Sequence, residues 1–435
     1  MHTPIMLNVH IVTLFPEFFS SPLACGLIAR AQEKGLITFS LHNPRSYSTL
    51  RHQHVDDSPY GGGPGMVMQA EPVLAALRAL PRPGRILYLT PQGRPFTQKL
   101  AAELAREEHL TFLCTRYEGL DDRVQNLLPL EPLCLTDAVL NSGDSAALAV
   151  IEAVSRLVPG FMGKESSGEE ESFSDHLLEY PHYTRPEELE GLSVPPILLS
   201  GHHEKIASWR RAQSILRTRA LRPDLLAQAH LTKSDVDVLC AQKKARVGRN
   251  LSFCLVHHPV RIEGRQVGTS SLTNLDIHDI ARISASYGLG PFFVLTPLND
   301  QKRLLASILA HWLKDPVRLR HPDRARALEM VQEVSDLEEA VQALSRRTGC
   351  RPAVVASSAR WPGKGDSPLL TVSDLRERLE TTPVLFCLGT AQGLSEAFVR
   401  ACDGRVRPLR FLGYNHLSVR SAAAIYADRI LGDYD

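Results

Sequence analysis

The sequence predicts an α/β fold with mostly parallel sheets, built in two separate halves. Short β-rich runs alternate with helical patterns in the first half of the chain and again in the second. Between them, from about 160 to 240, helical patterns continue without a clear strand. Alternating strands and helices predict a parallel sheet covered on both faces. The 435 residues also exceed what one ordinary core holds, so we expect two or three domains.

The first half contains short apolar runs between helical patterns. The predicted strands lie at 9–15, 36–41, 85–90 and 110–115, and the predicted helices at 22–34, 71–80, 94–108 and 144–157. The stretch that follows, FMGKESSGEEESF, is polar, glycine-bearing and acidic, which predicts a mobile loop.

Alternation resumes near residue 248. The predicted strands lie at 253–258, 291–296, 352–357 and 383–389, and the predicted helices near 276–287, 299–314, 334–347, 393–402 and 416–431. We therefore expect domains at 1–160, 161–245 and 246–435.

Composition excludes several classes of protein. Hydrophobic residues make up 43% and charged residues 22%, as in ordinary globular proteins, and a net charge of +1 gives no overall attraction to nucleic acid or membrane. No apolar run is long enough to cross a bilayer, and the first residues lack a basic leader with a cleavage site.

Cysteine and histidine usage favours the cytoplasm and gives no metal site. The eight cysteines form no C-x-x-C pair, so neither a disulfide framework nor a zinc site is indicated. The histidine pairs His202–His203 and His257–His258 have no partner at metal-site spacing, which favours loop or strand-end positions.

A glycine-rich stretch, SPYGGGPGMVMQ, runs from Ser58 to Gln69 and puts four glycines into positions 61–65. Such a segment provides positive φ angles or lets a ligand approach the backbone closely, although a flexible connector has the same composition. It lacks the Gly-Lys-Ser/Thr end of a P-loop.

A basic stretch, KIASWRRAQSILRTRALR, runs from Lys205 to Arg222 with six cations and no carboxylate. On a helix, Arg210, Arg211 and Arg217 would form a phosphate-binding face; the alternative is a solvated helix. Because this stretch has no acidic residues to balance its cations, the sequence favours binding of RNA or DNA. A nicotinamide-dependent oxidoreductase is disfavoured, because GTAQGL at 389–394 does not have the G-x-G-x-x-G spacing.

Residues 6 to about 242 resemble the bacterial tRNA (guanine-N(1)-)-methyltransferases, which belong to the SPOUT class of knotted methyltransferases. The matching stretches are VTLFPEFF, DDSPYGGGPGMVMQ, YLTPQGR, TRYEGLDDRV, AVSRLVPG, LEYPHYTRPEELEGLSVPPILLSG and the W-R-x-x-Q-S-x-x-R-T run from Trp209. Residues 250–435 resemble another SPOUT-type RNA methyltransferase family through LVHHPV, TNLDIHDIAR, LTPLNDQ, LGTAQGL and YNHLSVRSAA. The resemblance implies a parallel sheet threaded through a trefoil knot, then a small helical domain and a second SPOUT-like α/β domain.

The resemblance also implies an activity. The enzyme would move a methyl group from S-adenosylmethionine to ring nitrogen 1 of the guanosine 3′ of the anticodon in a tRNA anticodon stem-loop, as an obligate homodimer with its active site at the subunit interface. The cofactor would lie in three turns, at 89–93, 115–119 and 135–143. The implied cofactor residues are Leu89, Thr90, Pro91, Gly93, Thr115, Tyr117, Glu118, Gly119, Leu135, Thr136, Asp137, Ala138, Val139, Leu140 and Gly143.

Two residues match the family's catalytic positions. Guanine nitrogen 1 carries a proton at neutral pH, so a base must remove it, and Glu171 stands where the family has an aspartate. Arg156, in AVSRLVPG, matches the family's arginine and would neutralise charge on the guanine carbonyl oxygen. The alternatives are a solvated acidic lid at 169–171, which includes Glu169 and Glu170, and a structural helix-end cation at Arg156.

The resemblance places the target base beside the glycine-rich loop, where bare backbone lets a flipped base approach. The implied substrate-binding residues are Asp56, Pro59, Tyr60, Gly61, Gly62, Gly63, Arg210, Arg211 and Arg217.

This chain departs from the family in the cofactor turns. Ser142–Gly143–Asp144 replaces Gly-Gly-Glu, Thr115 and Thr136 each replace a glycine, and Ala138 replaces a tyrosine. A side chain at a positive-φ position would be strained, and glutamate moves the catalytic carboxylate out by about one methylene. We expect retained activity with shifted geometry; a decayed site with a surviving RNA-binding surface is the alternative.

In the second half, the implied cofactor residues are Gly389, Thr390, Gly393, Leu394, Asn415, Leu417, Ser418 and Arg420. Asn415 or Ser418 would serve equally as a helix N-cap. The family often has G-T-G-W-G-L where this chain has Ala391 and Gln392.

The TNLDIHDIAR helix is polar at Asn274, Asp276, His278, Asp279 and Arg282, which fits either contact with RNA or a partner subunit, or a satisfied helix start. For the whole protein, the alternative function is an RNA-binding scaffold in which one or both knots bind no cofactor.

Overall fold

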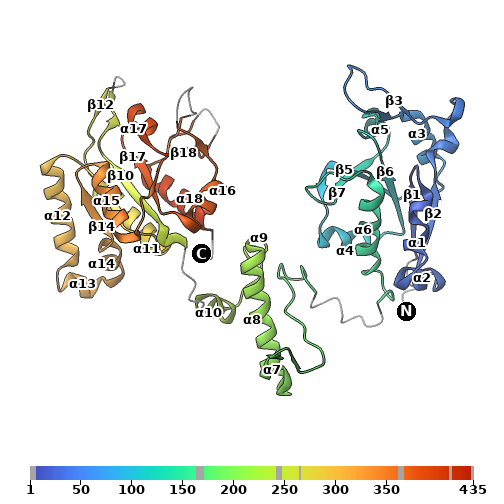
Figure 1. Cartoon of the computed structure of the whole chain (residues 1–435), viewed down its shortest axis with the longest axis horizontal. Coiled ribbons are helices and arrows are strands. Elements are labelled where there is room, and N and C mark those ends of the chain that lie inside the picture. The colour runs from blue at the N-terminus through green and yellow to red at the C-terminus, as the bar shows by residue number, and fades with distance from the viewer. Residues whose placement is uncertain are drawn as a thin grey trace. The chain divides into compact units, whose positions relative to one another are not determined.

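The computed structural model describes residues 6–162, 171–241, 247–263, 266–360, 367–410 and 414–432. The chain divides into two compact units, Met1–His230 and Leu231–Asp435 (Figure 1). Each unit is built on a parallel β-sheet with helices packed on both faces, so the predicted α/β class is confirmed.

The described part of the first unit has a five-stranded parallel sheet in the order β2-β1-β6-β5-β7. Its strands are β1 (Leu7–Val12), β2 (Ile37–His42), β5 (Arg85–Pro95), β6 (His109–Cys114) and β7 (Leu130–Cys134). The four predicted strands are β2, β1, β6 and β5. The sequence analysis missed β7, which contains Pro132; proline fits there because β7 is an edge strand that pairs only with β5.

Helices cover both faces of this sheet. One face carries α2 (Gly26–Glu33), α4 (Gln98–Leu104) and α6 (Gly143–Ser155), and the other carries α3 (Ala70–Arg78) and α5 (Arg123–Leu127). Ile28, Leu100 and Val150 pack into the first layer of the core, and Val73 and Val124 into the second. A short helix, α1 (Ser20–Leu23), precedes α2.

The rest of the described first unit contains the long helix α8 (His203–Leu221) between α7 (Pro196–Leu199) and α9 (Pro223–Leu226), in the region where helical patterns were predicted. Only Ser214, Ile215 and Thr218 of α8 are buried. The sequence analysis missed a small antiparallel hairpin, β8 (Glu188–Leu189) with β9 (Leu192–Ser193). Residues 163–170, which include Glu169, Glu170 and most of the predicted mobile loop, lie outside the described residues.

The described part of the second unit has a seven-stranded parallel sheet in the order β14-β13-β10-β17-β15-β18-β16. Its strands are β10 (Leu251–Val256), β13 (Phe292–Leu295), β14 (Val331–Val334), β15 (Ala353–Ala356), β16 (Leu369–Leu370), β17 (Val384–Gly389) and β18 (Gly404–Val406), with a separate hairpin of β11 (Val260–Arg261) and β12 (Val267–Gly268). The four predicted strands form the contiguous centre, β13-β10-β17-β15.

Helices again cover both faces. The larger layer contains α11 (Asn274–Ser286), α12 (Asn299–Leu313), α14 (Pro322–Leu328), α16 (Val372–Thr381) and α18 (Val419–Leu431), and the other contains α15 (Leu337–Thr348) and α17 (Glu396–Ala401). Two further helices are α10 (Lys233–Ala241) and α13 (Val317–Arg320). The sequence analysis did not anticipate α13, α14 or α16.

Among the described residues, no helix combines the length and apolar character needed to cross a membrane. All eight cysteines lie in the described part of the chain, and none is disulfide-bonded.

Candidate functional site

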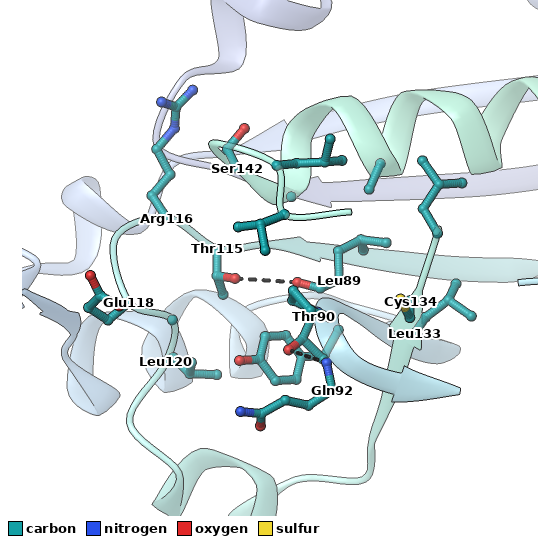
Figure 2. A pocket seen from close by; sticks show the side chains of 18 of the residues that line it. Leu89, Thr90, Gln92, Thr115, Arg116, Glu118, Leu120, Leu133, Cys134 and Ser142 are labelled. Carbon is teal, nitrogen blue, oxygen red and sulfur yellow. Dashed lines mark hydrogen bonds between the residues drawn. The ribbon is translucent and has the colours of Figure 1, made fainter. Parts of the chain in front are cut away.

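A cavity of about 360 Å³ opens in the first unit where β5, β6 and β7 end (Figure 2). Its walls are the three turns that were expected to hold the cofactor. All of the expected residues except Gly93 and Asp137 line it. Sequence segments that lie tens of residues apart therefore meet in one hollow at the carboxyl edge of a parallel sheet, which is where ligands of open α/β sheets bind.

The first turn is a bulge in β5. Leu89 and Arg94 both pair with Leu133 of β7, so residues 90–93 loop out of the ladder. Within the loop, the Gln92 amide donates to the Thr90 hydroxyl at 3.3 Å (Figure 2). Gly93 lies against β7 so closely that a Cβ there would fall 2.3 Å from the Leu133 nitrogen. Gly93 therefore supports the cavity from behind instead of lining it.

The second turn carries the unusual backbone of the site. Tyr117 has a φ of 58° and Gly119 a φ of 116°. The Thr115 hydroxyl donates to the Leu89 carbonyl at 3.4 Å and ties the first two turns together (Figure 2). The strain considered for the family departures does not arise, because Thr115, Thr136 and Ser142 have no positive φ.

The third turn ends at the start of α6, where space is the constraint. A Cβ on Gly143 would lie 3.0 Å from both the Cys114 Cα and the Thr115 nitrogen. Ser142 is the N-cap of α6, and its hydroxyl accepts from the Asp144 amide at 3.3 Å. The sequence Ser142–Gly143–Asp144, which replaces the family's Gly-Gly-Glu, thus keeps the glycine that the packing requires and adds Ser142 as a helix cap.

Asp144 is buried and anchors a residue that the sequence analysis missed. Its carboxylate accepts from the Thr13 hydroxyl at 2.6 Å and from the Arg116 guanidinium at 3.0 Å. Arg116 lines the cavity and also lies 4.2 Å from the centre of the Phe15 ring. Nothing in the sequence spacing links Arg116 to Asp144, because the pair forms only when β6 and α6 pack together.

The glycine-rich loop lies beside the second turn. Gly61, Gly62, Gly63 and Gly65 all have positive φ, which confirms the backbone requirement predicted for this stretch. The loop is held between β3 (Asp56–Asp57) and β4 (Val67–Met68). The Glu118 amide donates to the Met66 carbonyl, and the Met68 amide donates to the Gly119 carbonyl, both at 2.9 Å. Pro59 and the fully exposed Tyr60 stand on this loop.

The two residues matched to catalytic positions are in contact. Arg156 is the C-cap of α6, and its guanidinium donates a hydrogen bond to the Glu171 carboxylate. Both side chains remain partly exposed. Arg156 is therefore a helix-end cation and the ion-pair partner of Glu171 at the same time. Neither residue lines the cavity described above.

Glu171 lines a second cavity of the first unit, of about 410 Å³, together with Arg210 and Arg211 of α8. The three arginines of the predicted phosphate-binding face also hold the segment before α8. Arg210 lies 4.7 Å from the Tyr180 ring centre, Arg211 donates to Asp175 at 3.0 Å, and Arg217 donates to the Glu179 carbonyl at 3.1 Å. Burial alone would raise the pKa of Asp175, but hydrogen bonds from Arg211 and His230 outweigh it and lower that pKa.

The second unit contains a cavity of about 760 Å³ at the carboxyl end of β17. Of the expected cofactor residues, Gly389, Gly393, Leu394, Asn415 and Leu417 line it, and Thr390, Ser418 and Arg420 do not. The sequence analysis missed Arg261, Arg360 and Arg410 in its wall. Ala391 has a φ of 50°, so it occupies a left-handed position where the family glycine would be relaxed.

The residues that do not line this cavity have structural partners. Ser418 is the N-cap of α18, as the alternative interpretation held. Thr390 donates its hydroxyl to the Val256 carbonyl at 2.9 Å. Arg420 donates to Asp276 of α11 at 3.1 Å. Asp276 therefore has hydrogen-bond partners within the unit, as expected of a polar residue at the start of a helix. That interpretation of the helix start does not account for His278 or Arg282.

Two parallel sheets, each with a glycine-lined cavity at the carboxyl ends of its strands, place the chain among the α/β proteins that bind a ligand at that edge of the sheet. The model of the tRNA (Guanine-1)-methyltransferase TrmD family matches residues 7–228, and that of an SAM-dependent RNA methyltransferase family matches residues 250–432. The chain therefore belongs to the tRNA (guanine-N(1)-)-methyltransferase family and carries a second S-adenosylmethionine-dependent RNA methyltransferase domain.

Relatives of two lengths are similar to the chain, and all three described here are named tRNA (guanine-N(1)-)-methyltransferase. The protein from Oleidesulfovibrio alaskensis is 54% identical over 98% of this chain and 100% of its own length. The protein from Nitratidesulfovibrio vulgaris is 54% identical over 97% of this chain and 99% of its own length. The protein from Carboxydothermus hydrogenoformans is 52% identical over 53% of this chain and 91% of its own length. The two-domain arrangement is thus shared with some relatives and not with others.

Proposed function

We propose that the first unit transfers a methyl group from S-adenosylmethionine to ring nitrogen 1 of the guanosine immediately 3′ of the anticodon in tRNA. Family membership supports the reaction class. The observation that carries the residue assignment is the contact between Arg156 and Glu171, which joins the two residues matched to catalytic positions. Glu171 also lines a cavity with two arginines of the basic helix, where an RNA phosphate would find partners.

The lining of the cavity in the first unit is compatible with the positive charge of S-adenosylmethionine. When bound, this cofactor supplies an electrophilic methyl group on a positively charged sulfur. Glu118 and Asp122 line the cavity, and Arg116 is already paired with Asp144, so a cation is not repelled there. The three turns present backbone amides and carbonyls, which suit the polar edge of an adenine. Gly143 and Gly119 keep side chains from filling the space.

The chain's own residues then handle the proton and the developing charge. The Glu171 carboxylate accepts the proton from guanine nitrogen 1, which frees the lone pair on that nitrogen. Arg156 positions that carboxylate through its hydrogen bond and counters negative charge on the guanine carbonyl oxygen. The loop at 58–66 and the basic face of α8 hold the anticodon stem-loop.

We further propose that the chain belongs to the SPOUT class, with a trefoil knot, and acts as a homodimer in the cytoplasm. Apolar side chains around the mouth of the first cavity support the dimer. Val139 is 89% exposed, and Tyr117 and Leu140 are more than 40% exposed. Exposed apolar groups of this kind suit a covering partner. A second copy would bring its Arg156 and Glu171 to the first copy's cofactor cavity, whose wall contains neither residue.

The assignment is tested by single-turnover methylation of an unmodified tRNA transcript, with the product located by mass spectrometry of its nucleosides. Glu171→Gln should lower the rate by about 100-fold or more, because it removes a general base. Arg156→Ala should lower it by about 100- to 1,000-fold. Cofactor affinity should stay near the wild-type value in both variants.

Glu107→Gln is the matched control, because Glu107 also pairs with an arginine, Arg85, but lies outside the three turns. If both catalytic variants methylate at the wild-type rate while bound to tRNA, Glu171 and Arg156 have no part in the chemistry.

A further inference from the structure

The second unit has a hollow of about 590 Å³ between α11, α13 and α14 that shares no lining residue with the cavity at β17. Four arginines line it: Arg282 from α11, Arg320 from α13, and Arg324 and Arg326 from α14. We call this surface the arginine face. Asp323 is the only carboxylate in the wall of the hollow among the described residues. The hollow is therefore strongly positive.

These four cations lack the ion pairs that other arginines of the second unit make. In the described part of the chain, no carboxylate forms a salt bridge with Arg282, Arg320, Arg324 or Arg326. By contrast, Arg318 pairs with Glu329 at 2.8 Å. Four positive charges against one carboxylate leave the hollow with an excess of positive charge, and an anionic ligand would relieve the repulsion among them.

A half-buried aromatic group adjoins the arginines. The Arg324 guanidinium lies 4.5 Å from the centre of the Trp312 ring, and His321, which lines the hollow, lies 5.8 Å from the same ring. His278 lies 5.3 Å from Trp312, and both of its ring nitrogens are buried without a hydrogen-bond partner. Burial lowers the pKa of His278, and the charges of Arg324 and Arg282 contribute in the same direction. The hollow is thus lined by four arginines and one imidazole, that of His321, and Trp312 and His278 adjoin it.

We infer that the arginine face binds the phosphodiester backbone of RNA. Guanidinium groups bind phosphate oxygens through paired N–H donors. RNA is favoured over an anionic membrane because the second unit matches an RNA methyltransferase family. The inference goes beyond tRNA methylation by the first unit, and it holds whether or not the second unit transfers a methyl group itself.

The test uses the full chain and a fluorescein-labelled 20-nucleotide single-stranded RNA. Binding is measured over a range of salt concentrations, and hydrogen exchange reports which peptides the RNA protects. The basic helix of the first unit could also bind the RNA, so overall affinity alone does not locate the binding site. Hydrogen exchange locates it. RNA should protect peptides that cover 317–328, and Arg320→Ala combined with Arg326→Ala should abolish that protection. The negative slope of log affinity against log salt concentration should become less steep by about 1.4. Each phosphate contact on a single strand contributes about 0.7 to this slope, and the variant loses two contacts.

The control is Arg351→Ala combined with Arg400→Ala, which removes two exposed arginines already paired with Asp403 and Glu396. It should leave the protection at 317–328 unchanged. Arg320→Lys combined with Arg326→Lys keeps the charge and should recover most of the slope, which separates lost phosphate contacts from misfolding. Absence of RNA protection at 317–328 in the wild-type chain overturns the inference. So does protection of this face by phosphatidylserine vesicles but not by RNA.

Discussion

At the scale of single residues, the first cavity depends on two different uses of glycine. Gly61, Gly62, Gly63 and Gly65 provide positive φ in a loop with open space around most of them. Gly143 has an ordinary φ but no room for a side chain. Substitution therefore acts through backbone strain in the loop and through overpacking at Gly143.

Gly143→Ala should disturb the cavity directly. Its Cβ would press on the backbone of Cys114 and Thr115, neither of which can rotate away. We expect a loss of about 1–3 kcal/mol in the free energy of unfolding. The affinity of the first unit for S-adenosylmethionine should fall by about 10-fold or more, equivalent to about 1.4 kcal/mol. Denaturant titration and calorimetry measure the two quantities.

Ser145→Ala is the matched control, since Ser145 is exposed on the same turn of α6. It should change stability by no more than about 0.5 kcal/mol. Wild-type cofactor affinity in Gly143→Ala would show that the close contact at Gly143 does not shape the cofactor site.

Residue identities in the turns could be anticipated, but their partners could not. The resemblance supplied Thr115, Gly143, Arg156 and Glu171 as positions of interest. It gave no sign that Arg116 would pair with a buried Asp144, because that ion pair joins two segments 28 residues apart. Arg156 and Glu171 likewise meet only in the folded chain.

At the scale of elements, the sequence analysis found the central strands and one edge strand, β2, and missed the edge strands β7, β14 and β16 and the interior strand β18. Central strands such as β10 and β17 are buried on both faces, so their sequences are continuous apolar runs. The missed β7 contains Pro132, and the missed β14 has four residues of which the middle two are exposed. The missed β16 and β18 have only two and three residues. An edge strand needs one partner and one covered side, so its pattern is weaker.

One strand end also predicts a pH dependence. His257, directly after β10, is fully buried, and burial lowers its pKa to about 4, although Asp276 acts in the opposite direction. An unfolded chain binds a proton at His257 below pH 6.5, whereas the folded second unit does not until about pH 4. Stability is therefore complete above pH 6.5 and falls as the pH drops toward 4, by about 3 kcal/mol in total.

Hydrogen exchange of second-unit peptides at pH 7.5 and pH 5 measures this loss locally. His257→Asn should flatten the pH dependence, while the exposed His311, replaced by Asn, serves as the control. A second unit whose stability is equal at both pH values would mean that His257 takes up its proton without opposition in the folded state.

At the scale of the whole molecule, the described part of each unit contains one large parallel sheet with a cavity at the carboxyl ends of its strands. Relatives that cover 53% of this chain over 91% of their own length show that the family also occurs in a shorter form. The second unit, which this shorter form does not match, has its own core and its own candidate cofactor site.

Calorimetric titration with S-adenosylmethionine should give two sites per chain. Gly143→Ala should weaken the first-unit site and leave the other unchanged, because the two cavities are lined by different units. A single site would make one unit structural. No site at all would support the scaffold interpretation and remove the basis for catalysis.

The central claim is that the turns at 89–93, 115–119 and 135–143 form the cofactor site of the first unit. A crystal structure of the full chain grown with S-adenosylhomocysteine tests it most directly. We predict electron density for the ligand in the cavity between Leu89, Tyr117 and Leu140. Ligand density elsewhere in the first unit, with this cavity filled only by water, would contradict the account.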